Sequence, residues 1–368
     1  MQYIHQLPKW PDLYWDQAKL ALPLADMRHC QGLLLGRMSA LGFDSRAEAS
    51  LQVLTTNIIK SSEIEGEYLD SMQVRSSVAR RLGLDIGGLA PIDRHVEGIV
   101  DMMLDATQQY HSPLTDERLF GWHGALFPTS RSGLCLIMAG MWRLPEADPM
   151  QVVSGPMGRE RIHFEAPTAD RLADEMLAFL DWFNHVESID PVLKAAVAHF
   201  WFVTIHPFED GNGRIARAIA DMCLAQADNM SDRFYSMSCQ IEKERKDYYL
   251  MLERSQKGGL DITAWLEWFL GCLGRAIENA GQTLNTVLRK VQIFEKLNHR
   301  NINERQLKVL NRLFNGFEGK LTTAKYSKLT KCSHDTALRD IQKLIEYSVI
   351  KKSSASGRNT SYEIDLSV

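Results

Sequence analysis

The stretch HPFEDGNGRIAR (residues 206–217) places one histidine, two acids, an asparagine between two glycines and two arginines within twelve residues. Helical patterns flank it on both sides. The first helix opens at Asp190-Pro191, a cap followed by a first-turn proline, and the second is expected from about Gly213 through Ala227. The stretch therefore predicts a tight loop at the N-terminus of a helix, where free backbone N–H groups and the helix dipole attract an anion such as phosphate.

The side chains of this loop fit one kind of chemistry. His206 can accept a proton near neutral pH, and Asp210 is a hard oxygen ligand that suits Mg²⁺. Arg214 and Arg217 lie three residues apart, so they share a helix face and can both bind phosphate oxygens. Each feature alone is common in turns and helix ends. Together they predict a phosphate-bearing substrate, a metal ion and a hydroxyl nucleophile activated by His206.

The stretch resembles the signature of the Fic family, H-x-F-x-[D/E]-G-N-G-R-x-x-R, and fills every specified position. The resemblance covers roughly residues 1–300 and implies a mainly α fold, with a Fic-type helical core and a β-hairpin flap. It also implies protein AMPylation, the transfer of AMP from ATP to a Ser, Thr or Tyr hydroxyl. The Doc-type kinase branch has a lysine at the second glycine of the signature. Gly213 is intact here, which favours nucleotidyl transfer.

The resemblance assigns a role to each signature residue. His206 would be the catalytic base, Phe208 would anchor the loop in the core, and Asp210 would hold Mg²⁺ on the phosphates of ATP. The N–H groups of Gly211, Asn212 and Gly213 would hold the α-phosphate, with help from the Asn212 side chain. Arg214 would bind the α- and β-phosphates, and Arg217 would bind the γ-phosphate.

Two further segments extend the expected site. Residues 151–164 place a Gly-Pro-Met-Gly turn between β-prone runs, which predicts a hairpin. In the family this hairpin is the flap on which the target segment adds as a strand, and Val153 would line the adenine pocket. Tyr249 would contact the base from a later helix. A plain surface hairpin and an ordinary core tyrosine are the alternatives.

The segment SSEIEGE (61–67) lies at the end of a helix expected over residues 45–69. Ser61, Glu65 and Gly66 resemble the inhibitory motif [S/T]-x-x-x-E-[G/N] of the Fic family, which implies that Glu65 pairs with Arg217 and blocks the ATP γ-phosphate. We interpret the neighbouring Glu63 and Glu67 as solvated charges.

The bulk composition bounds the class of protein. The 368 residues fit two or three domains, and the net charge of −4 gives no overall attraction to nucleic acid or membranes. Six cysteines without a C-x-x-C pair indicate reduced thiols. No apolar segment is long enough to span a bilayer, so we expect a cytoplasmic protein without membrane contact.

Residues 301–368 carry a local charge of +5, which leaves −9 for the rest of the chain. Three short helices over 303–314, 322–331 and 333–348, followed by a strand, a turn and a strand, resemble a winged helix. The outward face of the third helix would offer Thr336, Arg339, Gln342 and Lys343 to DNA. Protein contact or dimerisation is the alternative, and is favoured because Asp335, Asp340 and Glu346 dilute the basic face.

The sequence therefore predicts an autoinhibited, Mg²⁺-dependent protein adenylyltransferase. Its partners would be ATP, a target hydroxyl at the hairpin and a second copy of the chain. The expected domains are a helical region with the inhibitory motif (1–92), the catalytic core (93–285), a connector (286–300) and the winged helix (301–368). Two alternatives stay open: a deAMPylase in which Glu65 positions water, and a DNA-binding regulator whose core senses nucleotide.

Overall fold

The chain folds into two compact units in the computed structural model: residues 1–281 (unit 1) and 282–368 (unit 2). The structure describes residues 2–84, 91–156, 158–298, 300, 302–314, 317, 319–353 and 360–365. Residues on both sides of the boundary expected after residue 92 belong to unit 1, and the four-part division remains a prediction. No helix in the described ranges is long and apolar enough to cross a membrane.

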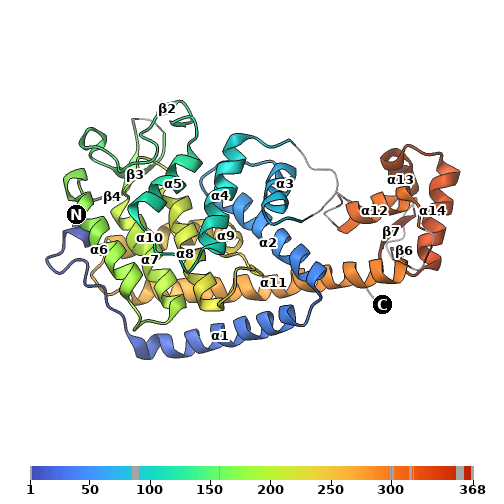
Figure 1. Cartoon of the computed structure of the whole chain (residues 1–368), viewed down its shortest axis with the longest axis horizontal. Coiled ribbons are helices and arrows are strands. Elements are labelled where there is room, and N and C mark those ends of the chain that lie inside the picture. The colour runs from blue at the N-terminus through green and yellow to red at the C-terminus, as the bar shows by residue number, and fades with distance from the viewer. Residues whose placement is uncertain are drawn as a thin grey trace. The chain divides into compact units, whose positions relative to one another are not determined.

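Unit 1 is built mainly of helices, as predicted (Figure 1). In chain order they are α1 (Gln17–Ser39), α2 (Phe43–Ile64), α3 (Ser71–Arg81), α4 (Arg94–Gln108), α5 (Asp116–Leu126), α6 (Leu172–His185), α7 (Pro191–Ile205), α8 (Asn212–Asp228), α9 (Met237–Lys243), α10 (Arg245–Gln256) and α11 (Thr263–Asn298), the last of which continues into unit 2. Short 3₁₀ turns lie at Ile4–Gln6, Pro145–Ala147 and Ala169–Arg171.

Helices α7 and α8 pack against each other and form the centre of unit 1. Nearly every residue of α7 is buried, because apolar side chains surround the whole helix and leave no polar face for solvent. Asp190 caps its N-terminus by accepting a hydrogen bond from the Val192 N–H, and Pro191 takes the first helical position, as predicted. The signature stretch is the turn that joins these two central helices.

Helix α2 ends at Ile64, five residues before the end predicted from the sequence. Gly66 adopts φ +84°, a left-handed conformation that closes the helix, and its N–H donates to Glu63 O at 3.0 Å. The Glu67 N–H then donates to Ser62 O at 3.0 Å. Consequently, Glu65 and Glu67 belong to a tight turn and not to the helix. Asp70 caps the following helix α3 by accepting hydrogen bonds from the N–H groups of Met72 and Gln73.

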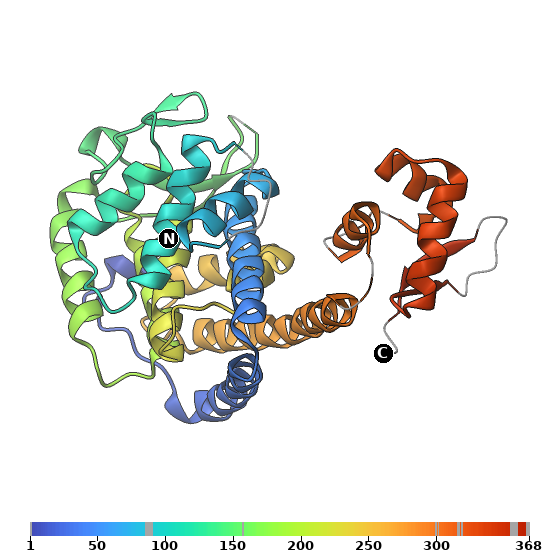
Figure 2. The same ribbon diagram turned by 45° about the vertical axis from the view of Figure 1, so that its right-hand side comes forward.

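Two antiparallel hairpins lie at the end of unit 1 that carries α5 (Figures 1 and 2). The first pairs β1 (Arg131–Ser132) with β2 (Cys135–Leu136). The second pairs β3 (Gln151–Ser154) with β4 (Arg161–Glu165) and contains a register shift between Val152 and Val153. The predicted hairpin over 151–164 is therefore confirmed, although residue 157 of its turn lies outside the described residues.

Unit 2 combines short helices with a small sheet, and its assignment as a winged helix remains a prediction. Its elements are α12 (Glu304–Phe314), β5 (Leu321–Thr322), α13 (Thr323–Thr330), α14 (His334–Glu346), β6 (Ile350–Lys352) and β7 (Ser361–Ile364). The strands form a sheet in the order β5-β7-β6. Apolar side chains from α12, α13 and α14 pack into one core with the sheet and with Ile293 and Leu297 of α11.

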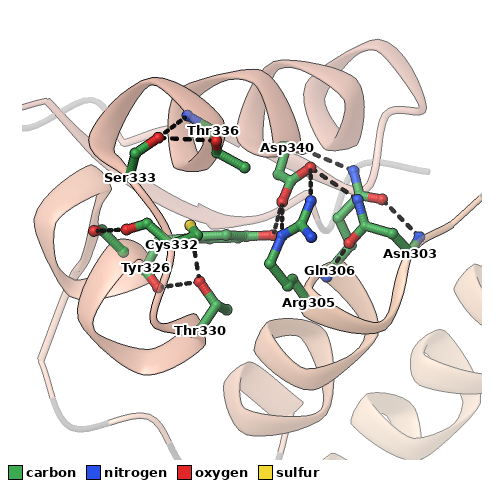
Figure 3. Close-up of polar contacts among 10 residues, drawn as sticks. Asn303, Arg305, Gln306, Tyr326, Thr330, Cys332, Ser333, Thr336 and Asp340 are labelled. Carbon is green, nitrogen blue, oxygen red and sulfur yellow. Dashed lines mark hydrogen bonds and ion pairs between the residues drawn. The ribbon is translucent and has the colours of Figure 1, made fainter.

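One acid of α14 does not lie where the sequence analysis placed it. Asp340 is buried, and it accepts hydrogen bonds from Arg305 Nε at 2.9 Å, Asn303 Nδ2 at 2.8 Å and Tyr326 Oη at 3.2 Å (Figure 3). The prediction that Asp340 dilutes the outward basic face was wrong, because its position in the helical period points it at α12 and α13. Asp335 and Glu346 are exposed.

Candidate active site

The turn between α7 and α8 has two residues in the left-handed region. His206 follows α7 with φ +53°, and Gly211 precedes α8 with φ +78°. A side chain at Gly211 would press against Phe127 and Leu126, so this position needs glycine for its space as well as for its φ. The backbone therefore turns sharply and presents the N-terminus of α8, as the sequence predicted.

His206 is held in one orientation by its neighbours. Its Nδ1 lies 3.2 Å from Val203 O, and because a carbonyl only accepts, Nδ1 carries the proton. Nε2 is then the nitrogen that can accept a proton. Arg143 fixes the backbone here by donating from Nε to His206 O at 3.0 Å. Burial lowers the pKa of His206, so the imidazole stays neutral at pH values where an ordinary histidine would be protonated.

Phe208 and Asn212 shape the loop from inside. Phe208 is fully buried and stacks on His123 with ring centroids 4.1 Å apart, as expected for an anchor. The Asn212 amide bridges the Phe208 backbone, accepting from its N–H at 2.9 Å and donating to its carbonyl at 2.8 Å. The Asn212 side chain is thus used within the loop. Its expected help at the α-phosphate remains a prediction.

Asp210 is the residue expected to hold Mg²⁺. Its Oδ1 accepts from the Gly211 N–H at 2.5 Å, and its Oδ2 contacts the Ser132 hydroxyl on β1. Across the described residues, no group of three or more His, Cys, Asp or Glu side chains could hold a metal ion. A single carboxylate fits Mg²⁺, which is often bound by one or two carboxylates together with substrate phosphates and water.

Glu65 contacts Arg217 as the sequence analysis expected. Glu65 Oε1 lies 2.8 Å from Arg217 Nη2. Ser61 holds the same guanidinium, because its hydroxyl accepts from Arg217 Nε at 2.9 Å and its carbonyl accepts from Nη2 at 2.7 Å. Gly66, which forms the left-handed turn, lets Glu65 face α8. The structure therefore brings together the three residues of the motif and the second signature arginine.

Gly213 and Tyr249 complete the surroundings of the Glu65 carboxylate. A Cβ at Gly213 would overlap Glu65 Oε1, so a glycine is what lets the carboxylate lie against the start of α8. Tyr249 Oη donates to Glu65 Oε2 at 3.3 Å. Burial and the Glu65 carboxylate raise the pKa of Tyr249 to about 12, so its hydroxyl stays protonated as a donor. Tyr249 is therefore a partner of Glu65, and its contact with a base remains a prediction.

The sequence analysis missed the role of Glu67, which it interpreted as a solvated charge. Glu67 Oε2 accepts from Arg214 Nη1 at 2.6 Å, and Glu67 Oε1 contacts His95 Nε2 of α4. The signal was present in the spacing: Glu67 follows Glu65 by two residues across a glycine, and Arg214 precedes Arg217 by one helical turn. A helix extended to residue 69 hid this correspondence.

Both signature arginines are buried, and each has a buried nitrogen that makes no hydrogen bond to the described residues. The side chains of Arg214 and Arg217 are 6% and 2% exposed. Within the described residues, Arg214 Nε and Arg217 Nη1 have no hydrogen-bond acceptor. A buried guanidinium N–H without an acceptor is costly, and an oxygen of a bound anion would satisfy it.

The β3–β4 hairpin is fastened to α10 by Glu253, a residue that the sequence analysis did not single out. Glu253 accepts from Arg161 Nη2 at 2.9 Å and contacts His163 Nδ1 at 2.6 Å. Burial alone would raise the pKa of Glu253, but hydrogen bonds from Lys257, His163 and Arg161 lower this pKa to about 2. Val153 is about half exposed on β3, and its role in an adenine pocket remains a prediction.

Family models match two parts of the chain. Residues 113–224 match the Fic/DOC family, and residues 3–84 match a domain of unknown function, DUF4172. The Fic/DOC match contains the whole signature stretch and ends inside α8.

Curated relatives carry the name protein adenylyltransferase Fic. The one from Nematostella vectensis is 33% identical over 114 residues, which is 30% of this chain and 25% of that protein. The one from Drosophila mojavensis is 27% identical over 227 residues, 60% of this chain and 40% of that protein. The chain thus spans between a quarter and less than half of the length of these relatives.

Solved structures show the same fold at low sequence identity. A Fic family protein from Desulfovibrio desulfuricans G20 is 21% identical with a TM-score of 0.55, covering 96% of this chain and 98% of that one. A Fic domain containing signaling protein from Bacteroides thetaiotaomicron is 19% identical with a TM-score of 0.51, covering 69% and 95%. The chain therefore carries a match to the Fic/DOC family at residues 113–224, with the complete signature on the α7–α8 turn, and it shares its fold with these solved proteins.

Proposed function

We propose that this protein is an autoinhibited protein adenylyltransferase that transfers AMP from ATP to a Ser, Thr or Tyr hydroxyl of a target protein and of itself. The observation that carries the proposal is the pair of buried signature arginines, each with a free N–H, at the N-terminus of α8 beside the His206 base. This arrangement suits a triphosphate and a proton acceptor on one loop.

In the proposed reaction the hydroxyl oxygen of the target attacks the α-phosphorus of ATP. His206 Nε2 takes the hydroxyl proton, the bond from the α-phosphorus to the bridging oxygen breaks, and the electron pair leaves with pyrophosphate. The N–H groups at the start of α8 and the two arginines would hold the phosphates in line. Mg²⁺, held by Asp210, would neutralise charge on the phosphates.

The hairpin β3–β4 would align the target segment by adding it as a further strand. Support for this role comes from the way the hairpin is fastened. Glu253 ties two residues of β4 to α10, and His5 Nε2 lies 2.8 Å from Glu165 O. Both contacts hold β4, and β3 exposes Val153 and Ser154.

Glu65 would act as the brake on this reaction. The γ-phosphate of ATP needs Arg217, and in the proposed resting state that arginine is held by Glu65 and Ser61. ATP would then bind with its α-phosphorus out of line for attack. Movement of Glu65 would release Arg217 and start transfer.

Transfer of label from α-labelled ATP with Mg²⁺ tests the proposal. The wild type, Glu65→Gly, His206→Ala and the control Glu63→Ala would be compared, with the protein itself and a cell lysate as acceptors. Strong labelling by Glu65→Gly, weak labelling by the wild type and Glu63→Ala, and none by His206→Ala would support it. If Glu65→Gly binds ATP but transfers no AMP, the adenylyltransferase proposal fails and removal of AMP from a modified protein takes its place.

A second candidate function is DNA binding by unit 2, and the burial of Asp340 favours it. With Asp340 turned inward, Arg339, Gln342 and Lys343 are exposed together on α14. Anisotropy with a labelled DNA duplex would test this at several salt concentrations. Arg339→Glu with Lys343→Glu should weaken binding and reduce the salt slope by about two, whereas Lys308→Glu on α12 should do neither. If the α14 double variant and Lys308→Glu weaken DNA binding equally, α14 is not the contact surface.

The expected homodimer also remains a prediction. Light scattering coupled to size exclusion would give the mass of the assembly directly, because one chain is 41.8 kDa.

A further inference from the structure

Two carboxylates lie on the two signature arginines in matching register. Glu65 contacts Arg217 at 2.8 Å, and Glu67 contacts Arg214 at 2.6 Å. The two arginines are one helical turn apart on α8, and the two glutamates flank Gly66. The turn after α2 therefore covers both arginines.

The backbone of this turn explains why both side chains face the same helix. Gly66 takes φ +84°, and the N–H groups of Gly66 and Glu67 close the end of α2 on Glu63 O and Ser62 O. Without the left-handed residue between them, neighbours two apart would continue around the helix and point in different directions. The glycine thus sets the direction of both carboxylates.

Glu67 is held in an ionised state by partners from two other helices. Glu67 Oε1 contacts His95 of α4, while Oε2 accepts from Arg214 of α8. Although burial alone would raise it, the contacts with His95 and Arg214 lower the pKa of Glu67. The guanidinium of Arg214 also lies over the Phe127 ring at 5.0 Å, so the arginine is fixed from both sides.

Glu63 offers a comparison within the same segment. It contacts Lys60, one turn earlier on α2, and has no contact with α8 among the described residues. An acid near this helix end does not reach the signature arginines merely because it is close in sequence. The Glu67 contact depends on the turn that Gly66 makes.

We propose that Glu67 is a second brake, which holds Arg214 as Glu65 holds Arg217, so that the site binds a triphosphate fully only when both carboxylates withdraw. The inference rests on the proposed function in taking ATP as the ligand. A phosphate at Arg214 would meet the negative charge of Glu67 and compete with it for the same guanidinium. Removing Glu65 alone would leave that competition in place.

Binding of Mg²⁺-ATP and of adenosine, measured by calorimetry in a His206→Ala background, separates this inference from the transfer reaction. Glu67→Ala should tighten ATP binding by about tenfold and leave adenosine binding unchanged, since adenosine has no phosphate. Glu65→Gly together with Glu67→Ala should bind ATP more tightly than either single variant. Glu63→Ala, the matched control, should bind as the background protein does.

A conservative variant and a partner variant guard against loss of fold. Glu67→Gln keeps the shape and an acceptor oxygen but removes the charge, and His95→Gln loosens Glu67 by weakening its direct contact with residue 95. Both should tighten ATP binding, by less than Glu67→Ala does, and thermal unfolding would show that the proteins stay folded.

The outcomes against the inference are distinct. If Glu65→Gly tightens ATP binding while Glu67→Ala leaves it unchanged or weakens it, Glu67 positions Arg214 and is not a brake. That result would leave the proposed function standing. If none of the variants binds ATP, the proposed function falls and this inference falls with it.

Discussion

The signature loop of unit 1 and the Asp340 cluster of unit 2 both pair arginine with carboxylate, but the buried partner is the arginine in unit 1 and the carboxylate in unit 2. In unit 2, Asp340 accepts from Arg305, Asn303 and Tyr326, and its backbone carbonyl accepts from Gln306 Nε2 at 3.0 Å (Figure 3). At the loop, two arginines share two glutamates and each keeps a buried N–H without an acceptor in the described structure.

This difference separates a cluster that specifies a fold from a site that awaits a ligand. A buried charge whose hydrogen bonds are all made stabilises one arrangement of helices, and losing one partner is costly. Buried donors without an acceptor are costly in the folded protein, and an anion that binds there stabilises the protein by supplying the missing acceptor. Changes at the loop should therefore alter function, and changes at Asp340 should alter stability.

The largest effect is expected at His206. Replacing it with asparagine keeps a residue that tolerates the left-handed conformation but removes the base. In a Glu65→Gly background, AMP transfer should fall by about a thousandfold while ATP binding persists. Rates of transfer from α-labelled ATP would measure the loss. A tenfold loss or less would mean that another group takes the proton.

The counterpart in unit 2 is Asp340→Ala. It removes the acceptor of Asn303, of Tyr326 and of Arg305, whose side chain is 40% exposed, so unit 2 should lose about 1–2 kcal/mol of stability. Hydrogen exchange of α12–α14 would report this loss. All eight tryptophans lie in unit 1, so tryptophan fluorescence should show that unit 1 unfolds as before.

Asp335→Ala is the control, because this acid lies on the same helix and is exposed. It should change stability by no more than about 0.5 kcal/mol. Equal effects of the two substitutions would show that the Asp340 cluster does not specify the fold of unit 2.

The sequence predicted the signature loop more fully than the surfaces around it, and the reason is physical. The loop is a local unit: the caps, the glycines and the spacing of residues 206–217 act within one turn, so a linear pattern contains them. The motif with Glu65 was likewise local, and its contact with Arg217 is confirmed.

What the sequence did not predict depends on partners far away along the chain. Glu67 meets Arg214 and His95, and Glu253 meets His163, each from a different element. Asp340 was placed on the wrong face because its partner Arg305 lies on another helix. Charge and spacing alone do not say which acids turn inward when the helices pack.

The two units should also lose stability in different pH ranges as the solution is made acidic. Burial lowers the pKa of His123 to about 4 and of His199 to about 3, both in unit 1. As pH falls below about 6.5, these two histidines become protonated in the unfolded chain before they do in the folded one. Each histidine therefore lowers the free energy of unfolding of unit 1 by about 1.4 kcal/mol per pH unit, down to its folded pKa. The contribution of both histidines to stability is fully present above pH 6.5.

Unit 2 should respond only at lower pH. Burial alone would raise the pKa of Asp340, but hydrogen bonds from Arg305 and Asn303 lower this pKa below its usual value near 3.8. Its contribution is then present above about pH 3.8 and lost below it. Urea unfolding at pH 7, 6, 5 and 4, followed by tryptophan fluorescence for unit 1 and hydrogen exchange for unit 2, would show the order. Parallel losses in the two units between pH 6.5 and 4 would contradict this assignment.

The smallest effect is the stabilisation of the wild type by nucleotide. If the unused donors of Arg214 and Arg217 await phosphates, Mg²⁺-ATP at five times its Kd should stabilise unit 1 by about 1 kcal/mol. Unit 2, whose buried carboxylate is already satisfied, should gain nothing from the ligand. Adenosine at the same multiple of its own Kd would stabilise unit 1 equally. The test is therefore made at equal concentrations, where only the phosphates distinguish the two ligands, and a shift as large with adenosine as with ATP would mean that the arginine donors are not what the nucleotide uses.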